Sequence, residues 1–481
     1  ISSRSSPRMT ESHSTPRMKE SRYVMMCSTI LGLANMLFFS GYDIQAFINE
    51  SVLHSFHGRE PERIGEFDGY FGQAIFSAVY CVSNLVVPSL LVCFGPKKLL
   101  VFGSCLMTLY FTSFIYLHRF TYFAACAALG HGFAVWASGY PAYLLEYSTR
   151  DTLGRNQAIS WAISCMSYLC AGIGFIGLTF VTATTGDDDS AGFKGKEFSD
   201  PDVRKYYGAC GASAILSIVL FCSLPTRRIE HSIAGGKERT GDGFFAQIAM
   251  MIRTLGHHRI RLLIPYYFYL GLFTPFYMSI IPTSMQFTHD LAVYRFLPAY
   301  YVLAYAGGIA CMGTLTAFAS RRIRDFGLKP VLCIHVAVDL AIYALILVSV
   351  PPHATTETID ERALLIQPNP YTSILLPFLF GVSDHGKNTA RAVVTTLALP
   401  VKRAHAIAVS RFYHAIAGCT LFLLSPVMTT PAYVAGFATI CVVSAALFWR
   451  TADVIRRQED QIALTEKSSG EENIATENPR V

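Results

Sequence analysis

Long runs of apolar residues alternate with short polar segments along almost the whole chain. Each of twelve runs is long enough to cross a hydrocarbon core of roughly 30 Å as a helix that rises about 1.5 Å per residue. Because only a helix satisfies all of its backbone polar groups within one segment in lipid, the pattern predicts an all-α membrane protein with twelve transmembrane helices. The predicted spans are residues 23–46, 69–93, 97–117, 121–145, 157–182, 206–224, 259–285, 296–319, 328–350, 371–397, 404–425 and 430–450.

The polar segments divide these spans into two groups of six. The longest internal polar segment, residues 225–258, is a basic loop between an N-terminal half at 23–224 and a C-terminal half at 259–450. This layout is typical of transporters built from two repeated halves. Within the loop, residues 243–256 have the composition of a helix that lies on a membrane surface.

Basic residues gather on one side of the predicted bundle. With the N-terminus in the cytoplasm, most of the 39 Lys and Arg residues fall in cytoplasmic segments, and the bias holds in every cytoplasmic loop. We therefore expect both termini in the cytoplasm, with polar, disordered tails at 1–22 and 451–481. The chain starts at Ile1 rather than Met, so we also expect residues before it. The plasma membrane and endomembranes are equal alternatives for its location.

Composition agrees with the hydropathy pattern and excludes several classes of protein. The 481 residues are 52% hydrophobic and 15% charged, whereas soluble domains carry about 25% charged residues. The 13 cysteines lie in apolar stretches without metal-site spacing, and no motif calls for a cofactor. Nucleotide-binding loops, HExxH and GxSxG motifs are absent, so neither an enzyme nor an ATP-driven transporter is predicted. The net charge of +6 forms no basic stripe with interleaved aromatics, so no nucleic-acid partner is expected.

The tenth predicted span carries the most unusual polar residues of the chain. Four of them recur at i, i+3, i+4 and i+7, a spacing that predicts one helical face: Asp384, Lys387, Asn388 and Arg391. Charged groups in mid-membrane are costly and by default mark function. We expect Asp384 to pair with Lys387 and the surplus positive charge to face a water-filled path, which suits an anionic solute or lipid headgroup. The alternative is a structural salt-bridge stripe, with Arg391 and Arg411 snorkelling to the cytoplasmic surface.

Other spans hold further candidates for substrate binding or gating, namely His131, Trp136, Asp43, Asp339 and His414. His131 lies near the middle of the fourth span, where it either titrates in step with solute movement or is a neutral histidine hydrogen-bonded between helices. Asp43 lies toward the outer end of the first span, so an interfacial position is its alternative. Asp339 lies halfway along the ninth span, where we expect it to pair with a basic group of a neighbouring span.

Local turns and bends add three features to the predicted bundle. The turn after the second span contains Gly95 and Lys97, and the equivalent turn after the eighth contains Asp325 and Gly327. Tight turns there would let the paired helices approach closely at their cytoplasmic ends. Prolines in the seventh span predict bends on which the halves would rock, at Pro265, Pro275 and Pro282. Asn49, followed by Glu50 and Ser51, forms an N-glycosylation triplet in the loop predicted to follow the first span.

Several segments together are similar to one family of membrane proteins. These are Ser83–Ser89, Gly130–Gly139, Leu153–Gln157 with Trp161 after it, and Phe380–Thr389. They resemble the uncoordinated-93-like family of the major facilitator superfamily, over about residues 25–450. The resemblance implies the twelve-helix fold of two six-helix halves. The Asp-Arg pair usual in this superfamily after span two is missing, and Lys387 and Arg391 stand where uncharged residues are expected.

Two functions are compatible with these patterns. The first is a secondary transporter of a small solute, anionic in view of the tenth span, which works by alternating access. The second is a non-transporting regulatory or accessory subunit of an ion channel or another membrane protein, because the resemblance implies relatives described as regulators of potassium channels. In either case the lipid bilayer is the immediate partner. The sequence names no solute, coupling ion or protein partner.

Overall fold

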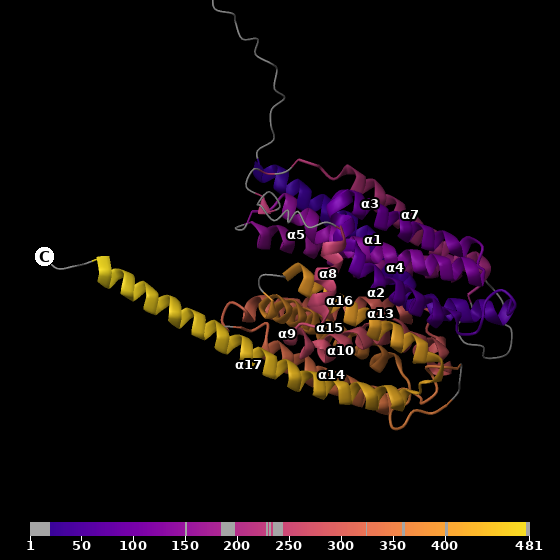
Figure 1. The fold of residues 1–481 in the computed structure, drawn as a ribbon. Helices are drawn as coiled ribbons and strands as arrows, with labels where there is room; N and C mark the ends of the chain where they lie inside the picture. The colour runs from indigo at the N-terminus through magenta and orange to yellow at the C-terminus, as the bar shows by residue number, and fades with distance from the viewer. Residues whose placement is uncertain are drawn as a thin grey trace, which may run out of the picture.

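Helices account for the regular structure of the chain in the computed structural model (Figure 1). The structure describes residues 20–149, 152–183, 198–227, 229, 232–233, 244–323, 325–357, 361–399 and 403–477. No strand occurs among these residues. The predictions for the tail before Glu20 and for most of the central loop lie outside them.

The N-terminal half begins with one long helix and continues with shorter ones. Its elements are α1 (Glu20–Arg59), α2 (Asp68–Phe94), α3 (Pro96–Thr112), η1 (Ser113–Ile115), α4 (Arg119–Glu146), α5 (Leu153–Cys165), α6 (Ser167–Ala183) and α7 (Asp200–Ser223). The pair α5 and α6 forms a single candidate span that is interrupted at Met166. α1 runs far beyond the predicted limit at residue 46, because residues 47–57 contain neither proline nor glycine.

The C-terminal half has more breaks, and several of them fall beside prolines. Its elements are α8 (Phe244–Leu255), α9 (His258–Arg261), α10 (Ile264–Pro275), the π-helical η3 (Phe276–Ile280), α11 (Ile281–Phe287), α12 (His289–Ala292), α13 (Leu297–Ala319), α14 (Lys329–Ser349), α15 (Pro370–Ala398), α16 (Arg403–Leu424), η5 (Ser425–Val427) and α17 (Thr430–Glu477). The π-helical turn lies between Pro275 and Pro282, in the span for which bends are predicted.

Ten helices in the described part of the chain are long and apolar enough to cross a membrane. The other two predicted spans are helical as well. The seventh is divided among α10, η3 and α11, and the tenth is the 29-residue α15, whose Asp384, Lys387 and Arg391 reduce its apolar character. Both belong to the bundle, since α10 packs against α16 and α17 while α15 packs against α13 and α14. The spans are thus assigned by length and composition for ten helices, and by position for these two.

The same helix pairs occur in both halves. α2 packs on α4 as α13 packs on α15, α3 packs on α4 as α14 packs on α15, and α1 packs on α7 as α10 packs on α17. The halves lie side by side, in indigo to magenta and in orange to yellow (Figure 1). They meet mainly through α2 with α16 and α6 with α13, and α1 also contacts η3 and α11. The two halves therefore have similar helix packing and meet at one interface.

Glycines permit the closest helix crossings, again at equivalent places. A Cβ atom at Gly130 of α4 would collide with the backbone oxygen of Phe76 in α2. In the other half, a Cβ atom at Gly381 of α15 would collide with the backbone oxygen of Tyr305 in α13, and one at Gly308 with that of Phe378. Each contact is backbone to backbone and cannot give way by a rotamer change.

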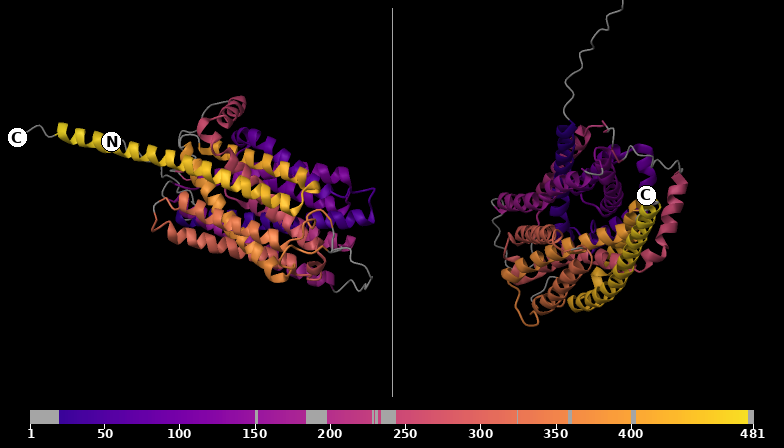
Figure 2. Two further views of the ribbon diagram at one scale, coloured as in Figure 1. Left: turned by 90° about the horizontal axis from the view of Figure 1, so that it is seen from below. Right: turned by 90° about the vertical axis from the view of Figure 1, so that its left-hand side faces the viewer.

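The last helix differs from the expectation for the C-terminal tail. α17 continues to Glu477 and projects beyond the bundle, at the end where α1 begins (Figures 1 and 2). Residues 451–481 were expected to be disordered. The segment after Arg450 is rich in Arg, Gln, Glu, Ala and Leu, which are strong helix formers, and extending an existing helix avoids the cost of nucleation.

Candidate functional site

Lys387 forms an ion pair inside the C-terminal half. Its Nζ lies 2.7 Å from Oδ1 of Asp339 on α14, and both residues are 0% exposed. The ammonium group also sits over the ring of Phe273. The prediction that Asp339 pairs with a basic group of a neighbouring span is confirmed. The expectation that Lys387 pairs with Asp384 is wrong.

The carboxylate of Asp339 has a full set of donors. Ser383 Oγ lies 2.5 Å from Oδ1, and the Tyr269 hydroxyl donates to Oδ2 at 2.7 Å. His335 Nδ1 is 3.5 Å from the same oxygen, and its Nε2 lies 3.0 Å from the Tyr266 hydroxyl. A buried ion pair with its remaining lone pairs occupied ties α10, α14 and α15 together. We therefore assign it to the framework of the half. The sequence signal for it was the pair His335 and Asp339, one helical turn apart.

The other polar residues of α15 point elsewhere, which corrects the prediction of a single face. At 3.6 residues per turn, Lys387 is rotated by roughly 60° from Asp384, whereas Asn388 and Arg391 lie within roughly 40° of it on either side. The four residues span an arc of roughly 100° with Lys387 at one edge. From there its Nζ reaches Asp339 of α14, inside the C-terminal half. Asp384 lies beside Tyr305 of α13, Arg391 lies near Arg411 of α16, and Asn388 donates to Asp384.

Asp384 lies in a cluster of hydroxyl and amide groups near the interface between the halves. Its Oδ2 accepts a hydrogen bond from Asn388 Nδ2 at 3.0 Å and lies 3.1 Å from the Tyr305 hydroxyl. The Tyr305 hydroxyl is also 2.8 Å from that of Tyr277. From the other half, the ring of Tyr168 on α6 packs edge-on against Tyr305, with centroids 5.1 Å apart. This tyrosine cluster joins the two halves beside a carboxylate.

Arg391 and Arg411 form the second polar group at the interface, and it is positive. Both side chains are half-buried, and their charges repel each other. Arg411 Nη1 donates to the backbone oxygen of Ala137 on α4, in the opposite half, at 2.7 Å. Neither arginine forms an ion pair with any residue that the structure describes. His414 lies near both charges, and its buried Nδ1 atom has no hydrogen-bond partner.

The candidates on α4 are held within the N-terminal half. His131 Nδ1 lies 2.9 Å from Ser83 Oγ on α2. This agrees with the alternative that His131 is hydrogen-bonded between helices. Trp136 Nε1 donates to Asn35 Oδ1 of α1 at 2.8 Å, and its ring stacks on Phe38. These contacts join α1, α2 and α4.

Asp43 is more deeply placed than the sequence suggested. Because α1 continues to Arg59, Asp43 lies in the interior of the helix and not at its outer end, and it is only 1% exposed. Its Oδ2 accepts a hydrogen bond from Ser167 Oγ of α6 at 2.9 Å. Asp43 is therefore buried between α1 and α6.

The same extension of α1 overturns the glycosylation prediction at Asn49. The residue lies within the helix and is 2% exposed. Its Nδ2 donates to the Tyr122 hydroxyl, and its Oδ1 accepts from the Tyr110 hydroxyl, both at 3.0 Å. A side chain that holds α1, α3 and α4 together has no room for a glycan.

The predicted turns adopt unusual backbone conformations at two residues. Gly95, between α2 and α3, has a φ of 76°, and Asp325, in the equivalent turn of the other half, has a φ of 56°. Lys97 is half-buried in the first turn of α3, and Gly327 packs close to Val393 of α15. The residue with a positive φ is thus a glycine in the first turn and an aspartate in the second.

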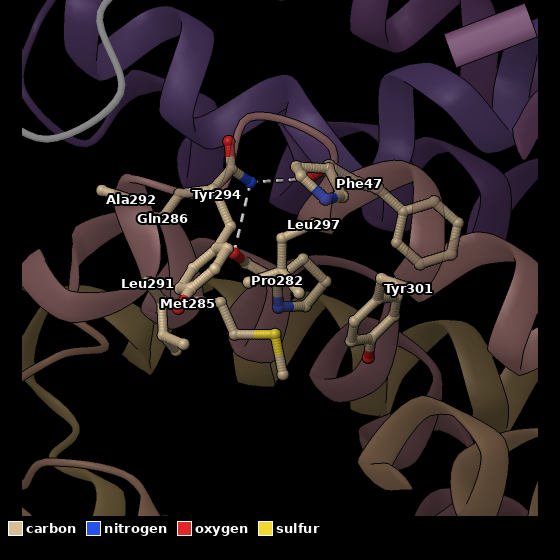
Figure 3. A pocket seen from close by; sticks show the side chains of 10 residues that line it. Phe47, Pro282, Met285, Gln286, Leu291, Ala292, Tyr294, Leu297 and Tyr301 are labelled. Carbon is tan, nitrogen blue, oxygen red and sulfur yellow. Dashed lines mark hydrogen bonds between the residues drawn. The ribbon is translucent and has the colours of Figure 1, made fainter. Parts of the chain in front are cut away.

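A pocket, with about 370 Å³ of empty space when the adjoining open solvent is included, lies at the end of the bundle that is predicted to face outward (Figure 3). Gln286 of α11 donates through Nε2 to the backbone oxygens of Phe47 and Pro282, both at 3.2 Å, and so joins α11 to α1. The rest of the wall is mainly apolar, with Met285, Leu297 and Tyr301. Of these residues the sequence singled out only Pro282, as a bend. No cluster of metal ligands occurs among the described residues.

A family model described as "Ion channel regulatory protein UNC-93" matches residues 60–449. The UNC93-like protein MFSD11 of Xenopus tropicalis is 24% identical over 427 residues, which cover 82% of this chain and 88% of that protein. Both agree with the resemblance found in the sequence.

Solved transporter structures share the fold at much lower identity. The peptide transporter POT in complex with sulfate has a TM-score of 0.63 and 12% identity, over 92% of this chain and 98% of that one. The xylose transporter XylE from E. coli, in a partially occluded inward-open conformation, has a TM-score of 0.57 and 13% identity, over 89% and 98%. The major facilitator superfamily fold expected from the sequence is thereby confirmed.

Proposed function

The chain belongs to the UNC-93 family, and on that premise we propose that it is a secondary transporter that carries a small anionic solute between its two halves by alternating access. The coarser part, a transporter-like membrane protein, follows from the fold and the family. The solute class and the mechanism are our proposal.

The observation that carries the proposal is the pair Arg391 and Arg411. An arginine within a span costs about 2.5–3.5 kcal/mol to insert, and two that repel each other are worse than one. If the two arginines only stabilised the fold, we would expect each to pair with a carboxylate, as Lys387 pairs with Asp339. Here neither arginine forms an ion pair with a described residue, and Asp384 attracts only Arg391 and from a greater distance, so a bound anion is our proposed counter-charge.

The position of the pair suits a transport site. Arg411 bridges to Ala137 of the opposite half, so the site spans the interface between halves and would be remodelled when they rock. At the predicted outer end the halves are joined by Gln286 to Phe47. Tyr168 packs against Tyr305 near the middle of their predicted spans. A site with that end closed would exchange its solute with the cytoplasm.

The test is a thermal-unfolding screen of the purified full-length protein with sulfate, phosphate and succinate as probes. A ligand at a hundredfold excess over its Kd stabilises the folded state by about 2.7 kcal/mol. We expect at least one probe to raise the melting temperature, and the Arg391→Gln/Arg411→Gln variant to lose that shift. Arg362→Gln, an exposed arginine outside the helices, is the matched control and should keep it. An equal shift in both variants, or no shift with any probe, would remove the proposed anion site.

The accessory role is the second candidate, and the description of the family model favours it. A regulatory subunit would bind a membrane-protein partner and need not move any solute. Cross-linking in native membranes, followed by purification and mass spectrometry, would detect a stoichiometric channel partner. Such a partner, together with proteoliposomes that take up none of the three probes, would replace the transporter proposal.

A further inference from the structure

We propose that Asp384 and the tyrosine cluster beside it bind an ammonium group, so that the solute of the arginine pair is a zwitterion. The inference rests on the proposed function, which places the anionic end of the solute at Arg391 and Arg411, and it names the chemistry of the other end. It is carried by the surroundings of Asp384, by an ammonium group that the chain itself binds in the same half, and by the spacing of the charged residues along α15.

The carboxylate of Asp384 has amide and hydroxyl donors but no ion pair. Its Oδ2 accepts from Asn388 Nδ2 at 3.0 Å and lies 3.1 Å from the Tyr305 hydroxyl. Oδ1 accepts no hydrogen bond from any residue that the structure describes, and the protein does not cover it completely. Lys387 and Arg391 attract the carboxylate from beyond ion-pair distance. One of its oxygens is therefore free to accept from a bound donor.

Three tyrosine rings surround this carboxylate, and they come from both halves. The rings of Tyr277 on η3 and Tyr305 on α13 are stacked with centroids 4.9 Å apart, and Tyr168 of α6 packs edge-on against Tyr305. The charge of Asp384 acts on all three. Because the faces of aromatic rings are electron-rich, rings beside a carboxylate favour a bound cation and disfavour an anion.

Lys387 shows how this half binds a buried ammonium group. Its Nζ lies 2.7 Å from Oδ1 of Asp339 and over the rings of Phe273 and Tyr269. The Tyr269 hydroxyl also donates to the same carboxylate. A carboxylate, a tyrosine hydroxyl that donates to it and adjoining aromatic rings all recur at Asp384. There the described part of the chain pairs no ammonium group of its own with the carboxylate, so we assign that role to the solute.

The spacing along α15 sets the distance between the two ends of the solute. Asp384 and Arg391 are two turns apart, which separates their Cα atoms by roughly 10 Å. Long side chains on a helix lean toward its N-terminus, so the guanidinium group of Arg391 extends toward Asp384 without forming an ion pair with it. Both side chains are half-buried. An ω-amino acid, whose charged groups lie at opposite ends of a short chain, fits this separation better than an α-amino acid.

Three probes of like length separate the two ends in thermal-unfolding titrations of the purified full-length protein. Butyrate carries the anionic end, butylamine the cationic end, and γ-aminobutyrate both. At constant ionic strength and near neutral pH, we expect γ-aminobutyrate to bind about tenfold more tightly than either of the others, as one more charge-assisted hydrogen bond would provide.

Variants assign each end to its residues. Asp384→Asn has the size of the natural side chain but no charge, so the affinity for γ-aminobutyrate should fall to that for butyrate, which itself stays unchanged. Retained butyrate binding also verifies that this variant is folded. Arg391→Gln/Arg411→Gln should lose butyrate and keep butylamine. Glu62→Gln, an exposed acid outside the helices, is the matched control and should bind all three probes as the natural chain does.

Two results would overturn the ammonium site: γ-aminobutyrate that binds no more tightly than butyrate, or an unchanged affinity for γ-aminobutyrate in Asp384→Asn. The anion site would survive either result, provided that butyrate still depends on the arginines. In the opposite case, butylamine and γ-aminobutyrate would depend on Asp384 but not on the arginines. That outcome would keep the ammonium site and reject the proposed anionic end.

Discussion

Lys387 and Asp384 show, at the scale of single residues, that spacing along a helix does not determine which charged residues form an ion pair. They are three positions apart on α15, yet Lys387 turns into the C-terminal half and meets Asp339 on another helix. There the charge is compensated by a carboxylate that also accepts from Ser383 and Tyr269. Arg391, one turn further along the chain, forms no ion pair with any described residue. The same helix thus carries one cation in a buried ion pair and one outside any such pair.

Removing Lys387 should damage stability and not just a binding site. Lys387→Met would leave Asp339 as an uncompensated buried charge, and breaking a buried pair in this way costs about 3–5 kcal/mol. Thermal or denaturant unfolding of the purified protein measures the loss. Replacing both partners, as in Lys387→Met with Asp339→Leu, should recover most of it. A single variant as stable as the natural chain would show that the ion pair contributes nothing.

At the scale of elements, backbone crossings define how helices of one half fit together. α15 reaches α13 so closely that Gly381 and Gly308 lie against each other's backbones, and Gly130 does the same for α4 on α2. The repetition of this device in both halves is consistent with repeated six-helix units. It also keeps the cluster of Asp384, Tyr305 and Tyr277 within hydrogen-bond distance, because Tyr305 is part of the crossing.

Gly381→Ala should therefore separate α13 from α15. The added methyl group meets a backbone oxygen, so the helices must shift, at a cost of about 1–3 kcal/mol for overpacking. Gly177→Ala on α6, where nothing lies within 4 Å, is the matched control and should be neutral or slightly stabilising. Melting temperatures of the two variants in the same detergent make the comparison. Equal melting temperatures would mean that the crossing is not tight in solution.

At the scale of the whole molecule, α8 connects the two halves on the predicted cytoplasmic side. It packs against α2 of one half and α16 of the other. Ser89 Oγ of α2 donates to the backbone oxygen of Phe244 at 3.0 Å, and the Tyr413 hydroxyl of α16 donates to that of Leu255 at 3.3 Å. Met251 faces inward and is 0% exposed, whereas Phe245 is 82% exposed. The part of the central loop that was predicted to lie on the membrane is thus docked on the bundle by one face.

Met251→Asp should release α8, because it places a charge in the contact between α8 and the bundle. Trypsin cleavage after Arg253 would then become several-fold faster, which gel electrophoresis of timed digests can follow. Phe245→Asp changes the exposed face of the same helix and should leave the cleavage rate unchanged. Identical rates for both variants would contradict the docking of α8.

The sequence alone determined the class of the molecule. Twelve apolar runs, the bias of basic residues and the family segments all depend on composition within short stretches, which burial in lipid fixes without reference to neighbours. The helical fold and the family followed from them, and so did the candidates Asp43, Asp339 and Arg391. The predicted ends of α1 and α17 came too early. Polar residues were taken as the end of each helix, although many of them are themselves good helix formers.

Only the tertiary structure decided which candidates share a site. Lys387 forms an ion pair with Asp339, and Asn49 is buried and hydrogen-bonded to a neighbouring helix. Arg411 donates to the backbone oxygen of Ala137 in the opposite half. Each of these contacts links different helices, so it depends on how the helices are rotated and which of them adjoin. Hydropathy and spacing fix neither, since every buried face of a span looks alike in sequence. The pairing of charges across helices is therefore a property of the packed bundle.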